Sequence, residues 1–224
     1  MTDLLVTLAL AHFLGDFVLQ TARMAETKHQ TKVLLLHIAI HLVLVLALTG
    51  APLLALLIAA THLVIDRIKL MLPESLLTFL ADQAAHLAVL VALAAWRSDA
   101  AVWHLPDPAL ALALTLSGLI AATLAGGPAV GLLMKPYQDD AQADGLLRAG
   151  RMIGLLERSL IYLLLTTGQA AGIGFLIAAK SILRFDTANK DQRAGEYVII
   201  GTLASFGWAI AITQATMWLG AHLL

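Results

Sequence analysis

The sequence predicts an all-α fold, a polytopic bundle of about seven transmembrane helices, and three observations lead to that prediction. Hydrophobic residues make up 60% of the 224-residue chain and charged residues 13%, whereas soluble domains contain about 45–50% apolar and about 25% charged residues. Several segments approach the length of about 20 apolar residues that a helix needs to cross a bilayer. Ten-residue segments of strictly alternating polarity, which are typical of membrane β-barrels, are absent from the sequence.

Apolar runs place the expected spans at residues 3–20, 33–49, 51–69, 81–97, 108–126, 152–179 and 197–221. Gly50 and Pro52 mark a tight turn between the second and third spans. The sixth span exceeds the roughly 20 residues needed to cross, so it tilts, protrudes or breaks at the glycines of GQAAGIG. Six crossings plus a surface helix is the competing interpretation. We expect residues 1–97 to form a four-helix bundle and residues 98–224 the C-terminal helices of the same membrane domain.

Charge distribution predicts the orientation of these spans. Lys and Arg are more frequent in the loops after the odd-numbered spans, which favours an N-terminus outside the cell, although the cluster at 180–193 disagrees. We therefore expect a multi-pass protein of the bacterial cytoplasmic membrane. Residues 1–10 lack the basic region of a cleavable signal peptide. The chain has no cysteine, which excludes thiolate metal sites, and its formal net charge of −1 gives no field that would recruit nucleic acid.

Each of the first four spans carries two polar residues four positions apart. On an α-helix this spacing places both side chains on one face, one turn apart. In an up-down-up-down bundle the pairs fall at similar depths near the cytoplasmic helix ends, because the helices rise about 1.5 Å per residue. Four helices thus offer one polar layer. The pairs are His12 and Asp16, His37 and His41, His62 and Asp66, and Asp82 and His86.

These eight side chains predict a metal site. An ionisable group in hydrocarbon costs at least about 2.5–3.5 kcal/mol, so eight of them need one another, water or an ion. Imidazole and carboxylate together are ligands of zinc, iron and manganese, and facing helices of a bundle build di-metal sites from such pairs. We expect one or two divalent ions, zinc before iron or manganese. Asp66 and Asp82 are in addition the candidate catalytic carboxylates, with Asp82 as ligand or general base. A metal-free proton or ion pathway and interhelical polar contacts are the alternatives.

Further polar residues are candidates for orienting the ligands or binding an anion. Gln20 and Lys69 follow the ligand pairs on the same helix faces, although Lys69 could simply extend its ammonium to the lipid headgroups. The C-terminal half offers a cationic rim for phosphate or lipid headgroups, or else ordinary positive-inside flanking. The residues of this second group are Arg151, Glu157, Arg158, Lys180 and Arg184.

Five segments carry a resemblance to a known family: HFLGDFVLQ, HLVIDRIK, GRMIGLLER, AAKSILRF and EYVIIGTLASF. Together they resemble an uncharacterised bacterial integral-membrane family, number 3307 among the domains of unknown function. The resemblance extends over nearly the whole chain and implies no established activity. A looser similarity is to membrane-bound metal-dependent hydrolases, which gather His and Asp from successive spans. The HExxH and Gly-x-Ser-x-Gly motifs of other hydrolases are absent.

The leading functional hypothesis is an intramembrane metal-dependent hydrolase that acts on a lipid-linked or membrane-embedded substrate near the cytoplasmic leaflet. A second class is a membrane oxidoreductase with a di-iron centre or a haem. A third is a metal-ion or proton-coupled transporter, which the two tandem hairpins of the first four spans favour, since transporters are often built from repeats. Membrane lipids or a lipid-linked substrate are the expected partners, nucleic acid is not, and homo-oligomerisation is left open.

Overall fold

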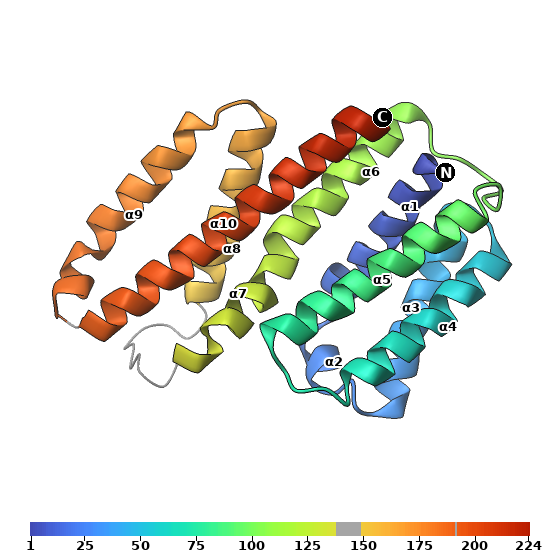
Figure 1. The fold of residues 1–224 in the computed structure, drawn as a ribbon, viewed down its shortest axis with the longest axis horizontal. Coiled ribbons are helices and arrows are strands. Elements are labelled where there is room, and N and C mark those ends of the chain that lie inside the picture. The colour runs from blue at the N-terminus through green and yellow to red at the C-terminus, as the bar shows by residue number, and fades with distance from the viewer. Residues whose placement is uncertain (138–148, 191) are drawn as a thin grey trace. The chain divides into compact units, whose positions relative to one another are not determined.

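The predicted all-helical class is confirmed. The computed structural model describes the backbone of residues 1–137, 149–190 and 192–224, and throughout these residues it contains helices and no strand (Figure 1). The chain divides into two compact units. The first unit is Met1–Ile120 with Leu219–Leu224, and the second unit is Ala121–Trp218.

Five helical segments are long and apolar enough to cross a membrane, which agrees with the predicted class of membrane protein. They are Thr2–Leu19, Thr31–Thr49, Leu76–Trp96, Asp107–Tyr137 and Gly195–Leu223. The helix α4 (Pro52–Lys69) is not among them, and its last turn carries Asp66, Arg67 and Lys69. The count of about seven spans stays a prediction.

Local signals fix the ends of the helices in the first unit. The Thr21 hydroxyl accepts a hydrogen bond from the Met24 amide at 3.2 Å and begins α2, and Ser75 does the same for the Thr78 amide at 3.1 Å and begins α5. Gly50 ends α3 in the left-handed conformation, with φ of 67°. The bounds of these elements are α1 Thr2–Phe13, η1 Leu14–Leu19, α2 Ala22–Glu26, α3 Thr31–Thr49, α5 Leu76–Trp96 and α6 Asp107–Ile120.

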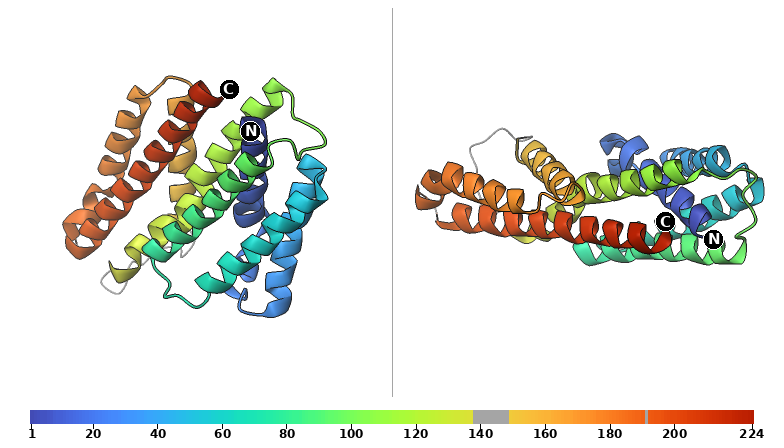
Figure 2. Two further views of the ribbon diagram at one scale, coloured as in Figure 1. Left: turned by 45° about the vertical axis from the view of Figure 1, so that its right-hand side comes forward. Right: turned by 90° about the horizontal axis from the view of Figure 1, so that it is seen from above.

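Helix α1 is the central element of the first unit, in contact with α3, α5 and α6. Helices α3 and α4 lie side by side, as both views of Figure 2 show. Leu4 and Leu8 of α1 pack with Leu54 of α4 and Leu90 of α5 in an apolar cluster that precedes His12 along α1. This cluster holds the four polar faces of α1, α3, α4 and α5 toward one another.

The second unit begins with a π-helical turn, η2 (Ala121–Ala125), inside an otherwise continuous helical segment. The predicted span at 152–179 is broken in the structure: α8 (Ala149–Thr166) ends before Gly168, whose φ of 75° is the left-handed conformation that glycine adopts without strain. Of the three alternatives for this overlong segment, the chain therefore takes the break. The remaining elements are α7 Gly126–Met134, η3 Lys135–Tyr137, α9 Ala171–Lys190 and α10 Gln192–Leu223.

Candidate metal centre

All eight predicted ligands lie together in the first unit. Each is buried, with between 0 and 9% of the residue exposed. The first pair lies where α1 passes into η1, and the other pairs lie on α3, α4 and α5 in turn. The polar faces predicted from the four-residue spacing thus do meet in one layer. The members are His12, Asp16, His37, His41, His62, Asp66, Asp82 and His86.

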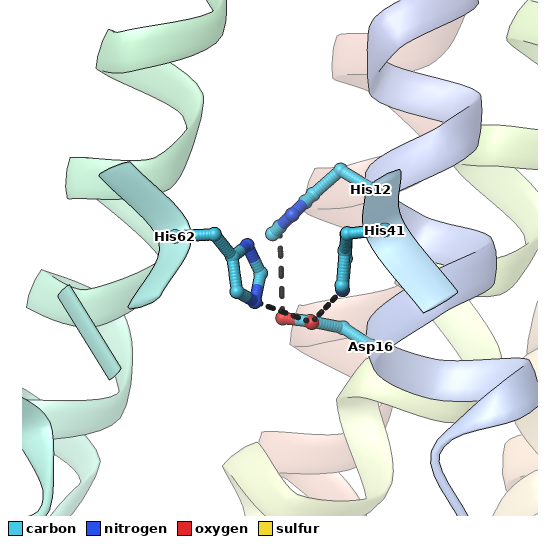
Figure 3. Close-up of side chains that lie close together, drawn as sticks. All are labelled: His12, Asp16, His41 and His62. Atoms are coloured by element: carbon cyan, nitrogen blue, oxygen red, sulfur yellow. Dashed lines mark hydrogen bonds and ion pairs between the residues drawn. The ribbon is translucent and has the colours of Figure 1, made fainter. Parts of the chain in front are cut away.

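The Asp16 carboxylate is the centre of this layer. Its Oδ1 atom lies 3.0 Å from His41 Nε2, 3.2 Å from His37 Nε2 and 3.4 Å from His62 Nε2. Its Oδ2 atom lies 3.7 Å from His12 Nε2. Figure 3 shows the rings of His12, His41 and His62 directed at the two oxygens of this carboxylate. Four imidazoles from three helices therefore surround one carboxylate group.

The spacing of these atoms suits hydrogen bonds and is also close to that of a metal ligand shell. In a tetrahedral zinc site with metal–ligand distances of about 2.0–2.1 Å, neighbouring ligand atoms stand about 3.3–3.4 Å apart. The separations around Asp16 Oδ1 are 3.0 to 3.4 Å, and His37 Nε2 lies 3.1 Å from His62 Nε2. A hydrogen bond between those two nitrogens uses one proton at most, so one of the rings presents a lone pair there. The cluster is compact and offers at least one nitrogen lone pair between His37 and His62.

A second group of ligand atoms adjoins the first. One ligand atom from each of Asp66, Asp82 and His86 lies within 4.8 Å of the others. His86 Nδ1 is 2.9 Å from the Asp82 backbone oxygen, which can only accept, so Nδ1 carries the ring proton and Nε2 carries the lone pair. His86 Nε2 and Asp82 Oδ1 are buried and make no hydrogen bond. Both atoms are available to a cation.

Two lysines pair with carboxylates of the second group. Lys69 Nζ donates to Asp82 Oδ2 at 2.6 Å and lies over the Phe79 ring, so it is tied to the cluster as well as reaching the surface. Lys28 Nζ lies 2.7 Å from Asp66 Oδ2. Sequence reasoning missed Lys28, because it follows α2 in a connection and nothing in the local pattern distinguishes it from an ordinary basic loop residue.

Gln83 also belongs to the site and was not predicted. Its amide nitrogen donates to Asp16 Oδ2 at 3.2 Å and to Asp82 Oδ2 at 3.1 Å, and its Oε1 lies 3.3 Å from His12 Nε2. A polar residue beside Asp82 in an apolar helix was the available signal. Gln20, which was predicted, lies where the chain leaves η1 in an extended conformation, and its buried Oε1 makes no hydrogen bond.

Gly15 allows the close approach of α3 to η1. A Cβ atom at this position would overlap the imidazole ring of His41. We predict that Gly15→Ala displaces that ring and weakens metal binding by about 10–100-fold, the usual cost of disturbing how a ligand is held. Competition with a chromophoric chelator measures this. Gly131→Ala, where a Cβ meets no neighbour within 4 Å, is the matched control; equal affinities in the two variants would show that the His41 position does not matter.

The predicted C-terminal candidates lie in the second unit. Lys180 Nζ donates to Glu157 Oε2 at 2.8 Å and lies over the Phe206 ring. Arg151 is exposed on α8, and Arg184 is on α9 with its side chain outside the described part of the structure. The first unit, by contrast, contains the eight ligands.

Arg158 is buried in this second unit, with 4% of the residue exposed. Its Nε and one terminal nitrogen donate to the Thr123 carbonyl at 3.0 and 2.9 Å, and the other donates to Ser205 Oγ at 3.1 Å. The Trp208 indole donates to the Ala121 carbonyl at 3.0 Å. Both carbonyls belong to η2, where the wide turn departs from the regular hydrogen-bond ladder, so these side chains stabilise the turn.

A protein-family model matches residues 4–107 of the chain. This range contains the eight clustered ligands and the segments HFLGDFVLQ and HLVIDRIK; the three other segments on which the resemblance was based lie outside it. No match was found among curated proteins or among solved structures. The looser similarity to metal-dependent hydrolases is thus without support from these comparisons. Over residues 4–107 the chain resembles the uncharacterised family described as "Protein of unknown function (DUF3307)".

Proposed function

We propose that the polar layer of the first unit binds a divalent cation and that the protein is an intramembrane metal-dependent hydrolase. In this proposal it acts on a lipid-linked or membrane-embedded substrate near the cytoplasmic leaflet of the bacterial cytoplasmic membrane. The observation that carries the proposal is the convergence of three imidazole nitrogens on one carboxylate oxygen at 3.0 to 3.4 Å.

The residues divide into two roles. Asp16, His41 and His62, with His12 and His37 beside them, would hold the ion, and when bound it would activate water and polarise a scissile carbonyl or phosphoryl group. Asp66 and Asp82 lie next to this set and are the candidates for moving a proton. The Gln83 amide donates to both Asp16 and Asp82, so it fixes the carboxylate of the ligand set relative to the proposed base.

Zinc is the ion we propose, because four-coordinate imidazole and carboxylate sites suit it and the ligand spacing is tetrahedral in scale. Iron or manganese would use the same side chains. Iron would favour the di-iron oxidoreductase, and reversible passage of the ion into liposomes would favour a transporter. The identity of the ion and its passage across the membrane therefore distinguish a hydrolase, an oxidoreductase and a transporter.

The first experiment is elemental analysis of the protein purified in detergent. We expect one or two equivalents of zinc in the wild type and in His104→Ala, whose exposed side chain lies in a connection of the same unit. We expect His62→Ala to lose the ion, because His62 Nε2 lies within 3.4 Å of Asp16 Oδ1 and 3.1 Å of His37 Nε2. Circular dichroism establishes that the variant is folded. The proposal is wrong if the folded wild type takes up no zinc, iron or manganese on reconstitution.

A further inference from the structure

The proposed ion would leave the polar layer with a net positive charge. Three carboxylates, Asp16, Asp66 and Asp82, face two ammonium groups, Lys28 and Lys69. With neutral imidazoles, which metal ligation requires, the layer carries one net negative charge. A divalent cation turns this into one net positive charge. The ion-loaded layer then has an excess positive charge that a bound anion would neutralise.

The positions of the two lysines show where that anion belongs. Their ammonium groups lie at 2.7 and 2.6 Å from Asp66 and Asp82, the two carboxylates adjacent to the ligand set around Asp16. An ammonium has three donors, so a carboxylate oxygen leaves further donors of each lysine for another oxyanion.

The side chain of Lys69 also connects the surface of the first unit with the polar layer. Its side chain is 34% exposed while that of its partner Asp82 is 3% exposed, so the lysine runs from the surface of the unit to the buried carboxylate. Three exposed apolar residues follow it in the sequence, namely Leu70, Met71 and Leu72. A molecule that reaches the layer beside Lys69 thus meets an ammonium group flanked by hydrocarbon.

We infer that Lys28 and Lys69 bind the phosphate group of an amphiphilic substrate beside the ion. This inference rests on the proposed metal site and names the substrate class of the same site. Phosphate is the oxyanion that fits, because a phosphate monoester carries about −1.5 to −2 charges and three acceptor oxygens, enough to engage both lysines. Lysine is a common phosphate ligand and acts as a point charge. The apolar surroundings of Lys69 accommodate an acyl or isoprenoid chain.

The test is calorimetric titration of the zinc-loaded protein in detergent with two probes, inorganic phosphate and dioleoyl phosphatidate in mixed micelles. We expect the wild type to bind both, the lipid more tightly. Lys69→Met should weaken both by about tenfold or more, since a hydrogen bond to a charged group contributes about 1.5–3 kcal/mol. Lys28→Arg keeps the charge and the pairing with Asp66, and it should retain binding better than Lys28→Met. Arg67→Gln removes an exposed cation from the same turn of α4 and should leave affinity unchanged.

The outcomes separate this inference from the proposed function. Zinc in every sample, with equal affinity for the probes in the wild type and both Met variants, overturns the inference and leaves the metal site intact. Binding of phosphate but not phosphatidate assigns the site to a soluble phosphate and overturns the amphiphile. Absence of zinc from the wild type overturns the proposed function, and the inference falls with it.

Discussion

Replacing Asp16 by Asn is expected to abolish metal binding while leaving the protein folded. Asp16 Oδ1 is within 3.4 Å of three imidazole nitrogens, and no other carboxylate oxygen in the described structure gathers as many. Asn keeps the shape and loses the charge that holds a cation. Because residues that merely support ligands contribute about 10–100-fold to affinity, removal of this central ligand should cost more than about 100-fold. Competition with a chromophoric chelator measures the loss.

Asp3→Asn is the matched control for this change. Asp3 lies in the first turn of the same helix and is exposed, so its substitution alters the net charge equally without touching the cluster. Retention of wild-type zinc affinity by Asp16→Asn would show that the layer is a hydrogen-bonded polar core, as interhelical polar contacts are in other membrane bundles. Unfolding of Asp16→Asn would instead be visible by circular dichroism, and Asp16→Glu then serves as the folded variant.

Arg158→Met is expected to lower the free energy of unfolding by about 3 kcal/mol, since each hydrogen bond to a charged group contributes about 1.5–3 kcal/mol. The variant loses two bonds to the Thr123 carbonyl and one to Ser205. Met fills a similar volume, so the loss reports on polar contacts and not on a cavity. The midpoint of thermal unfolding in detergent measures it.

Two further variants test whether the lost stability comes from the hydrogen bonds of Arg158. Arg151→Met removes an exposed guanidinium from the same helix and should change the midpoint little. Arg158→Lys keeps the charge but not the forked donor geometry, so we expect an intermediate midpoint. A cost for Arg158→Met no larger than that for Arg151→Met would mean that the η2 carbonyls find other partners, and Arg158 would then be available to an anion, as the sequence first suggested.

Periodicity predicted the part of the site that lies on regular helix. The spacing of His37 and His41, and of Asp82 and His86, is enough to place each pair on one face, and antiparallel order is enough to bring the faces to one depth. The glycines around Gly168 offered a break as one of three alternatives for the overlong segment, and the structure has that break between α8 and α9. These features depend on residues near one another in the chain.

Contacts that join distant segments were not predictable. Lys28 reaches Asp66 from a connection, and the length of its side chain lets it do so from many positions. Arg158 pairs with the backbone of Thr123, which no side-chain pattern reveals. The π-helical turns also leave no recognisable pattern in the sequence, because the wider turn requires no particular residue. Two cluster members, Lys28 and Gln83, were missed. Only Gln83 differs visibly from its sequence neighbours, as a polar residue in an apolar helix.

The ion pair between Lys28 and Asp66 bears on how the chain enters the lipid during its synthesis. Lys28 precedes the second apolar helix and Asp66 lies near the end of the third, so neither charge has this partner until the third apolar helix has emerged. Asp16 gains its contact with His62 at the same stage, whereas His37 and His41 of the first hairpin already face it. An unpaired charge in hydrocarbon costs at least about 2.5–3.5 kcal/mol. The first three apolar helices are therefore best released from the insertion machinery as one group, and a truncation after residue 50 would leave Lys28 without Asp66.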